Sequence, residues 1–87
     1  MTAKTKLQSA LDKIEKEVND AMIKWPPMHS AHEGYAVLLE EVDELWDEVK
    51  LNQKKRSVQK MGDEALQVAA MALRFYLEVC NETVIRR

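Results

Sequence analysis

The sequence predicts an all-α protein, because its composition suits helices and three of its segments are amphipathic. Of the 87 residues, 46% are hydrophobic and 32% are charged, while only two are glycine and two are proline. This composition fits long helices better than a turn-rich β fold or a disordered chain. A chain of this length forms about one small domain, so we expect residues 1–87 to be a single helical domain.

The first predicted helix covers about residues 3–23. Apolar side chains recur there at spacings of three and four residues, with charged residues between them: Leu7, Leu11, Ile14, Val18 and Met22. This is the period of an amphipathic helix. Pro26 and Pro27 end the helix, because proline lacks an N–H group and disfavours helical geometry in the residue before it. The segment WPPMHS is therefore expected to be a rigid connection.

Ser30 followed by Glu33 predicts the start of a second helix, since this pair is typical of a capping box. An apolar stripe continues from there to about Leu51, where the polar run NQKKRS predicts a turn. The stripe consists of Tyr35, Leu38, Leu39, Val42, Leu45, Trp46 and Val49. Ser57 is expected to cap the next helix.

The third predicted helix runs from about Ser57 to Val84 and is apolar on two faces. One face contains Leu66, Ala69, Leu73, Leu77 and Val84, and the other contains Val68, Met71, Phe75 and Val79. A helix that is apolar on both flanks needs two neighbours, which three helices of one chain supply only in part. We therefore expect a helical hairpin with an added N-terminal helix, assembled into a homo-oligomeric four-helix-type bundle such as a dimer or tetramer.

Charge and hydropathy exclude several classes of partner. Thirteen basic and fifteen acidic side chains give a net charge of −2, so the chain has no overall field to hold nucleic acid. It contains no apolar run near the roughly 18 to 20 residues that span a bilayer, and the start MTAKTKLQSALDK is too polar for a signal peptide. We expect a cytoplasmic protein.

The single Cys80 excludes an intramolecular disulfide and zinc held by paired thiolates, and it is expected in the core.

A cluster of acids lies on the second predicted helix. Glu40, Glu41, Glu44 and Glu48 share a sector about 100° wide beside the apolar stripe. Neighbouring like charges repel one another, and a bound cation would remove this repulsion. If the second and third helices pack antiparallel, Asp63 or Glu64 would complete a site of oxygen ligands suited to Mg²⁺, or to Mn²⁺ in its place. The alternative is an acidic face that only interacts with solvent.

The run AHEGYAVLLEEVDELWDEV, followed after the turn by KMGDEALQVAAMALRF, resembles the MazG-like all-α nucleoside triphosphate pyrophosphohydrolases. The similarity covers roughly residues 25–80. The EExxE motif of that family is present as Glu40, Glu41 and Glu44. The second motif, ExxD, is incomplete in both possible registers: Lys60 replaces the glutamate before Asp63, and Gln67 replaces the aspartate after Glu64.

The resemblance implies Mg²⁺-dependent hydrolysis of a (deoxy)nucleoside triphosphate to monophosphate and pyrophosphate, a house-cleaning reaction of the nucleotide pool. Glu41 and Glu44 would bind the metal together with Asp63 or Glu64. Glu40 would be a further ligand or the base that activates water, and Glu41 would share in catalysis. Because the second motif is incomplete, the alternative is a non-catalytic helical module of the same family that binds nucleotide or a partner.

Five further residues are candidates for substrate binding, each with a structural alternative. Lys54 in the turn and Lys60 would contact phosphate oxygens, or both would point to solvent. Arg74 lies among acids on a mostly apolar helix and would contact phosphate or form a structural ion pair. Trp25 would stack on a nucleobase or pack on a helix. His32 would donate to substrate or cap the second helix.

Overall fold

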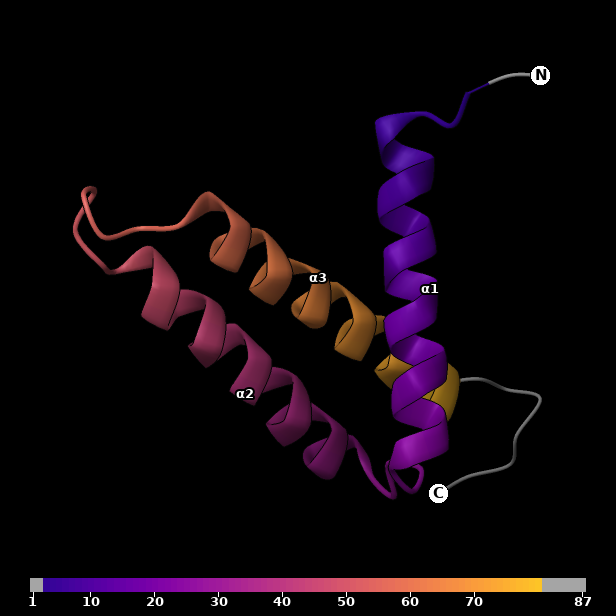
Figure 1. Cartoon of the computed structure of the whole chain (residues 1–87). Helices are drawn as coiled ribbons and strands as arrows, with labels where there is room; N and C mark the ends of the chain where they lie inside the picture. The colour runs from indigo at the N-terminus through magenta and orange to yellow at the C-terminus, as the bar shows by residue number, and fades with distance from the viewer. Residues whose placement is uncertain (1–2, 81–87) are drawn as a thin grey trace.

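The computed structural model describes residues 3–80, and this part of the chain is helical without a strand (Figure 1). Helix α1 spans Lys6–Lys24, α2 spans Ala31–Val49 and α3 spans Val58–Phe75. A short π-helix, η1, continues α3 over Tyr76–Cys80. The predicted all-α class is therefore confirmed. The predicted extension of the third helix to Val84 lies partly outside the described residues.

Hydroxyl side chains cap all three of these helices. Each accepts a hydrogen bond from the backbone N–H three residues later, and the capping residues are Thr5, Ser30 and Ser57. The caps at Ser30 and Ser57 are confirmed, whereas the Thr5 capping box with Gln8 was not predicted. The expected capping box at Ser30 is only half formed, because the Glu33 carboxylate accepts from the His29 N–H instead of that of Ser30. The start of α2 is unaffected by this shift.

Helices α2 and α3 form an antiparallel hairpin, and α1 crosses α3 toward the end of the hairpin away from the turn (Figure 1). Helix α1 packs on α3 and makes few contacts with α2. The principal extents of 47 × 41 × 19 Å describe a flat, open arrangement. No helix within residues 3–80 is long and apolar enough to cross a membrane.

The core lies where α1 crosses the hairpin. Its buried members are Val18, Ala70 and Met71. Around them pack the half-buried side chains of Ile14, Ala21, Val37, Leu38 and Leu77. A hydrophobic side chain stabilises the fold mainly by leaving water. With so few of them buried, this core is small for a chain of this size.

Many large apolar side chains remain exposed instead. The predicted stripe of α2 divides into two: Leu38 and Leu45 are half-buried, while Tyr35, Leu39, Val42 and Trp46 are exposed. On α3, Met71 is buried but Leu73 is exposed. Cys80 is also exposed, so its prediction as a core residue was wrong. Its position at the end of η1 leaves it beyond the crossing of α1 and α3.

Candidate metal centre

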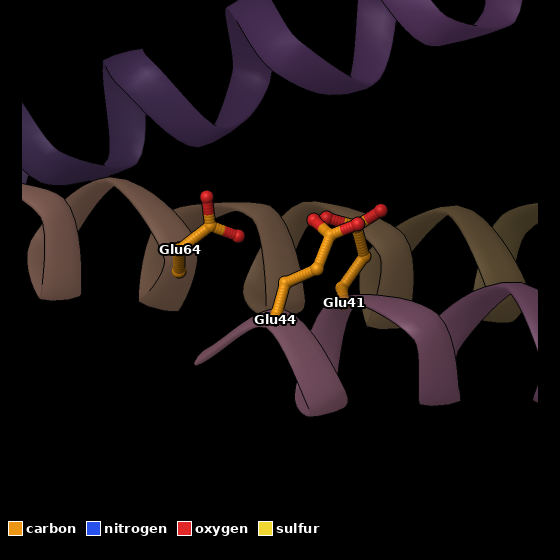
Figure 2. Close-up of side chains that lie close together, drawn as sticks. All are labelled: Glu41, Glu44 and Glu64. Atoms are coloured by element: carbon orange, nitrogen blue, oxygen red, sulfur yellow. The ribbon is translucent and has the colours of Figure 1, made fainter. Parts of the chain in front are cut away.

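Three glutamates from two helices meet in the middle of the hairpin. We call Glu41 and Glu44 of α2 and Glu64 of α3 the glutamate trio, and one oxygen from each lies within 4.8 Å of the other two. Figure 2 shows the Glu41 and Glu44 side chains reaching from α2 toward α3, where the Glu64 carboxylate lies. The spacing of three residues places Glu41 and Glu44 on one face of α2. Antiparallel packing of α3 then brings Glu64 opposite them.

The trio is electrostatically strained. Partial burial raises the pKa of Glu41, and the nearby carboxylates of Glu44, Glu64 and Glu40 raise it further. Partial burial likewise raises the pKa of Glu64, with Glu44 as the next contributor. Both causes act in the same direction, because low polarity and like charge each disfavour the ionised form. None of the ion pairs formed within residues 3–80 includes a member of the trio.

One oxygen of the trio has no partner. Glu64 Oε2 is buried and accepts no hydrogen bond from the described residues. Buried polar atoms normally have a partner, so such an atom requires an explanation. Carboxylate oxygens without thiolate or imidazole are the donor set that Mg²⁺ and Mn²⁺ prefer. The residues present thus fit a hard divalent cation.

The other predicted acids lie around the trio but outside it. Asp63 is exposed and faces a shallow depression shared with Lys13 and Lys16 of α1. Of the two acids considered on the third helix, it is therefore Glu64 that α3 brings to α2. Glu40 is exposed at the edge of an adjoining groove. Glu48 is half-buried and close enough to Glu64 to raise its pKa.

A groove of about 580 Å³ adjoins the trio and shares Glu41 with it. Its walls come from the last turns of α1, from the segment Trp25–Met28, and from α2 and α3. Carboxylates line much of it, namely Glu17, Asp20, Glu33, Glu40 and Glu41. Apolar and neutral walls are supplied by Ala21, Trp25, Pro26, Pro27, Met28, Val37, Gln67 and Met71, and the cations are Lys24 and Arg74. The groove can thus take a partly apolar ligand beside the trio.

Trp25 and Arg74 both line the groove, but they differ in how they are held. Trp25 is 54% exposed, and the Lys24 ammonium lies 5.0 Å from its ring centroid in a cation–π arrangement. Arg74 is buried, and its Nε donates a hydrogen bond of 3.0 Å to Glu78. The structural ion pair considered for Arg74 is therefore formed.

The remaining candidates form no ion pair with the trio within residues 3–80, although Lys60 lies one helical turn before Glu64 on α3. Lys54 is in the turn between α2 and α3, where its backbone N–H donates to the Asn52 side chain. Lys60 is exposed on the first turn of α3, and His32 is exposed on the first turn of α2. None of these three side chains lines the groove. Within one copy of the chain, Lys54 and His32 come from the turn and from the start of α2, outside the trio.

Comparison of this chain with protein-family models, with curated proteins and with solved structures finds no match.

The sequence analysis gave no role in the site to three residues, of which Gln67 and Met28 line the groove and Glu78 binds Arg74. Gln67 lies one turn after Glu64 on the same side of α3 and lines the groove, whereas in the sequence it was considered as the residue in place of the motif's aspartate. Met28 is the buried residue of the proline segment, and nothing in the local sequence predicts its burial. Glu78 does carry a signal, because it follows Arg74 by four residues on a mostly apolar helix. That spacing is typical of a paired charge.

Proposed function

We propose that this protein is a Mg²⁺-dependent pyrophosphohydrolase of (deoxy)nucleoside triphosphates, which releases a monophosphate and pyrophosphate. The glutamate trio is the observation that carries the proposal. It combines three carboxylates from two helices with a buried Glu64 oxygen that lacks a partner. The resemblance of the EExxE helix and the following segment to the MazG-like pyrophosphohydrolases supports the same reaction.

Glu41, Glu44 and Glu64 are proposed to hold the cation, with Mn²⁺ as a possible substitute for Mg²⁺. Such an ion, when bound, offsets phosphate charge and lowers the pKa of water. Glu40 is exposed at the edge of the groove and lies outside the trio. We propose it as the general base, which accepts a proton from the attacking water while Glu41 remains a ligand.

The groove is proposed to hold the nucleoside. Its volume of about 580 Å³ is in the usual range for small-molecule sites of ≈300–1,000 Å³. Trp25 and Met71 offer apolar surface to a base, and the Gln67 amide offers a hydrogen-bond donor and acceptor. Since the groove and the trio share Glu41, a nucleoside in the groove directs its phosphates toward the trio.

We further propose that two copies of the hairpin pack together as a four-helix bundle. Tyr35, Leu39, Val42 and Trp46 are all exposed and follow the 4-3-4 spacing of one stripe on α2. A second copy would bury this stripe and enlarge the small core. Two copies joined face to face make a symmetric interface, which is the commonest arrangement in homo-oligomers. A tetramer built from two such pairs is also compatible with the stripe.

Release of pyrophosphate tests the enzymatic proposal directly. The purified protein is incubated with Mg²⁺ and a panel of nucleoside and deoxynucleoside triphosphates, and pyrophosphate and monophosphate are measured. We expect turnover of at least one triphosphate that Glu64→Gln abolishes and Asp47→Asn leaves intact. Asp47 is a matched control because it is an exposed acid on α2 outside the trio.

A different outcome supports the alternative of a binding module. The specific observation in its favour is the incomplete second motif, in which Lys60 or Gln67 replaces an acid. If triphosphates raise the melting temperature of the protein but are never cleaved, the protein binds nucleotide without being an enzyme. If neither turnover nor stabilisation occurs, both proposals fail.

A further inference from the structure

A buried ion pair joins the end of α3 to the proline segment that forms one wall of the groove. Arg74 and Glu78 have exposed fractions of only 4% and 7%. The Glu78 carboxylate accepts from Arg74 Nε at 3.0 Å through one oxygen and from the Met28 N–H at 2.8 Å through the other. Arg74 Nη2 donates to the Pro26 carbonyl oxygen at 2.7 Å. The pair therefore bonds the chain on both sides of Pro27.

The proline segment depends on these bonds for its polar contacts with α3. Pro26 and Pro27 have no N–H group, so the segment cannot continue the backbone hydrogen bonds of α1. Hydrogen bonds to charged partners are stronger than those between neutral groups. Taking both charges out of water is itself costly, which makes this pair a poor device for stability alone. The cost of burying the pair is better explained if the groove depends on the position of the proline segment.

The pair also lies where the backbone changes from α-helix to π-helix. Arg74 is in the last turn of α3, and Glu78 is inside η1, whose hydrogen bonds span five residues instead of four. Single π turns within α-helices occur frequently at functional sites. Here the π turn carries the carboxylate that accepts the Met28 N–H.

We infer that Arg74 and Glu78 are positioning residues, which hold the segment Trp25–Met28 against α3 and thereby fix the groove wall on which substrate packs. The assignment to substrate rests on the proposed function; the fixing of the segment does not. Neither residue belongs to the glutamate trio. Loss of the pair should therefore weaken substrate binding while leaving the metal ligands and the chemical step in place.

The experiment replaces both charges by apolar side chains of similar size. Arg74→Met with Glu78→Leu leaves no unpaired buried charge, so the fold is expected to survive. All measurements use a Trp46→Phe background, in which Trp25 is the only tryptophan. The matched control is Asp47→Leu with Lys50→Met, which removes an exposed pair with an N···O distance of 3.0 Å at the far end of the hairpin.

In the double variant at Arg74 and Glu78 we expect acrylamide to quench Trp25 about twofold more strongly than in the control. The KM for the best triphosphate should rise about tenfold or more, with kcat changed by less than about threefold, because a loss of binding alone raises KM. The Mg²⁺-induced rise in melting temperature should persist. Arg74→Lys should keep only part of the wild-type affinity for the triphosphate, since lysine lacks the planar fork that reaches both partners.

Unchanged Trp25 quenching in a folded double variant would overturn the inference, as would a fall in kcat at constant KM. If the double variant does not fold, Glu78→Gln decides, because its amide oxygen still accepts the Met28 N–H while the charge pair is lost. It should then show the same KM increase in weaker form, and an unchanged KM overturns the inference. If the wild-type protein has no activity, the proposed function fails. The quenching measurement still decides whether the pair fixes the segment.

Discussion

Gly34 of α2 lies directly under the ring of Phe75 at the end of α3. A Cβ atom on residue 34 would be 2.6 Å from Phe75 Cδ2, which is closer than such atoms approach, and 3.1 Å from Met28 Sδ, which is a tight contact. Glycine inside a helix costs about 0.5–1 kcal/mol relative to alanine. The close approach of α2 to the ring offsets this cost, and it holds the start of α2 next to the proline segment.

The first prediction follows from this contact. Gly34→Ala should lower the free energy of unfolding by about 1–3 kcal/mol, because the new methyl group must displace Phe75. Gly62→Ala is the matched control, since nothing lies within 4 Å of the Cβ position there, and it should raise stability by about 0.5–1 kcal/mol. Urea unfolding of both variants measures the difference. Equal responses would mean that Phe75 does not pack on Gly34.

The second prediction concerns the acid that α3 would supply to the proposed metal site. Mg²⁺ should raise the melting temperature of the wild-type protein, because ligand that binds only the folded state stabilises it. Glu64→Gln should abolish the rise, and Asp63→Asn should leave most of it, since only Glu64 joins Glu41 and Glu44. Calorimetric titration with Mg²⁺ checks the same ranking of affinities.

The reverse ranking would place Asp63 at the metal and would require a shift of α3 relative to α2. Equal Mg²⁺ responses in wild type and in both variants would mean that the acids form only a solvated face. The sign of the stability change that Glu64→Gln causes without metal is a second check. Glu64→Gln should then be at least as stable as the wild type, because it removes a carboxylate that its neighbours repel.

The third prediction is a pH dependence of stability without divalent cations. The folded-state pKa values of Glu41 and Glu64 lie above the ordinary value of 4.5, so the folded protein binds more protons than the unfolded chain above that pH. The contribution of these two groups to stability must then fall as the pH rises through their folded-state pKa values, and it must rise on acidification toward 4.5. Melting temperatures measured in EDTA between neutral pH and about pH 5 test this sign.

Variants isolate the contribution of the trio from that of other carboxylates. Glu41→Gln and Glu64→Gln should each flatten this acid-induced increase, because each removes one titrating group of raised pKa. Asp47→Asn should not alter it. Saturating Mg²⁺ should also suppress the increase, since protons and the cation compete for the same oxygens. A melting temperature that falls steadily from pH 7 to 5 in EDTA would contradict the prediction.

The fourth prediction concerns self-association through the exposed stripe of α2. Sedimentation at micromolar concentration should show a dimer or larger species, and Trp46→Glu or Leu39→Glu should weaken association by at least about tenfold, as expected for buried interface residues. Ala36→Glu serves as the control, because Ala36 is exposed on the same helix outside the stripe. A folded wild-type monomer at that concentration would contradict the proposal.

The starts of α2 and α3 and the end of α1 were predictable because their signals are local, whereas α1 begins at Lys6 and not at about residue 3 as expected. Ser30 and Ser57 act on backbone groups three residues away, and Pro26 acts on its immediate neighbour. The face shared by Glu41 and Glu44 was predictable for the same reason, since helix geometry alone determines it. Information of this kind does not depend on how one helix meets another.

The choice between Asp63 and Glu64 was beyond the sequence, because adjacent residues point about 100° apart and only the packing of α3 on α2 selects one. Likewise, the Glu78 partner Met28 is 50 residues away along the chain. Cys80 was predicted in the core because its sequence neighbours are apolar. Such neighbours are buried only where a further helix covers them. In each case the missing information is the relative position of two helices.

The residues of α1 that contact the core are Ile14, Val18 and Ala21, from the middle of the helix onward. Leu7 and Leu11, in the first half, are 67% and 51% exposed. In a single copy of the chain, the opening turns of α1 can therefore unwind without breaking the core. Their amide hydrogens should exchange with deuterium far sooner than those of residues 14–21. Helix α1 would then unfold in two parts of different local stability and not as one cooperative unit.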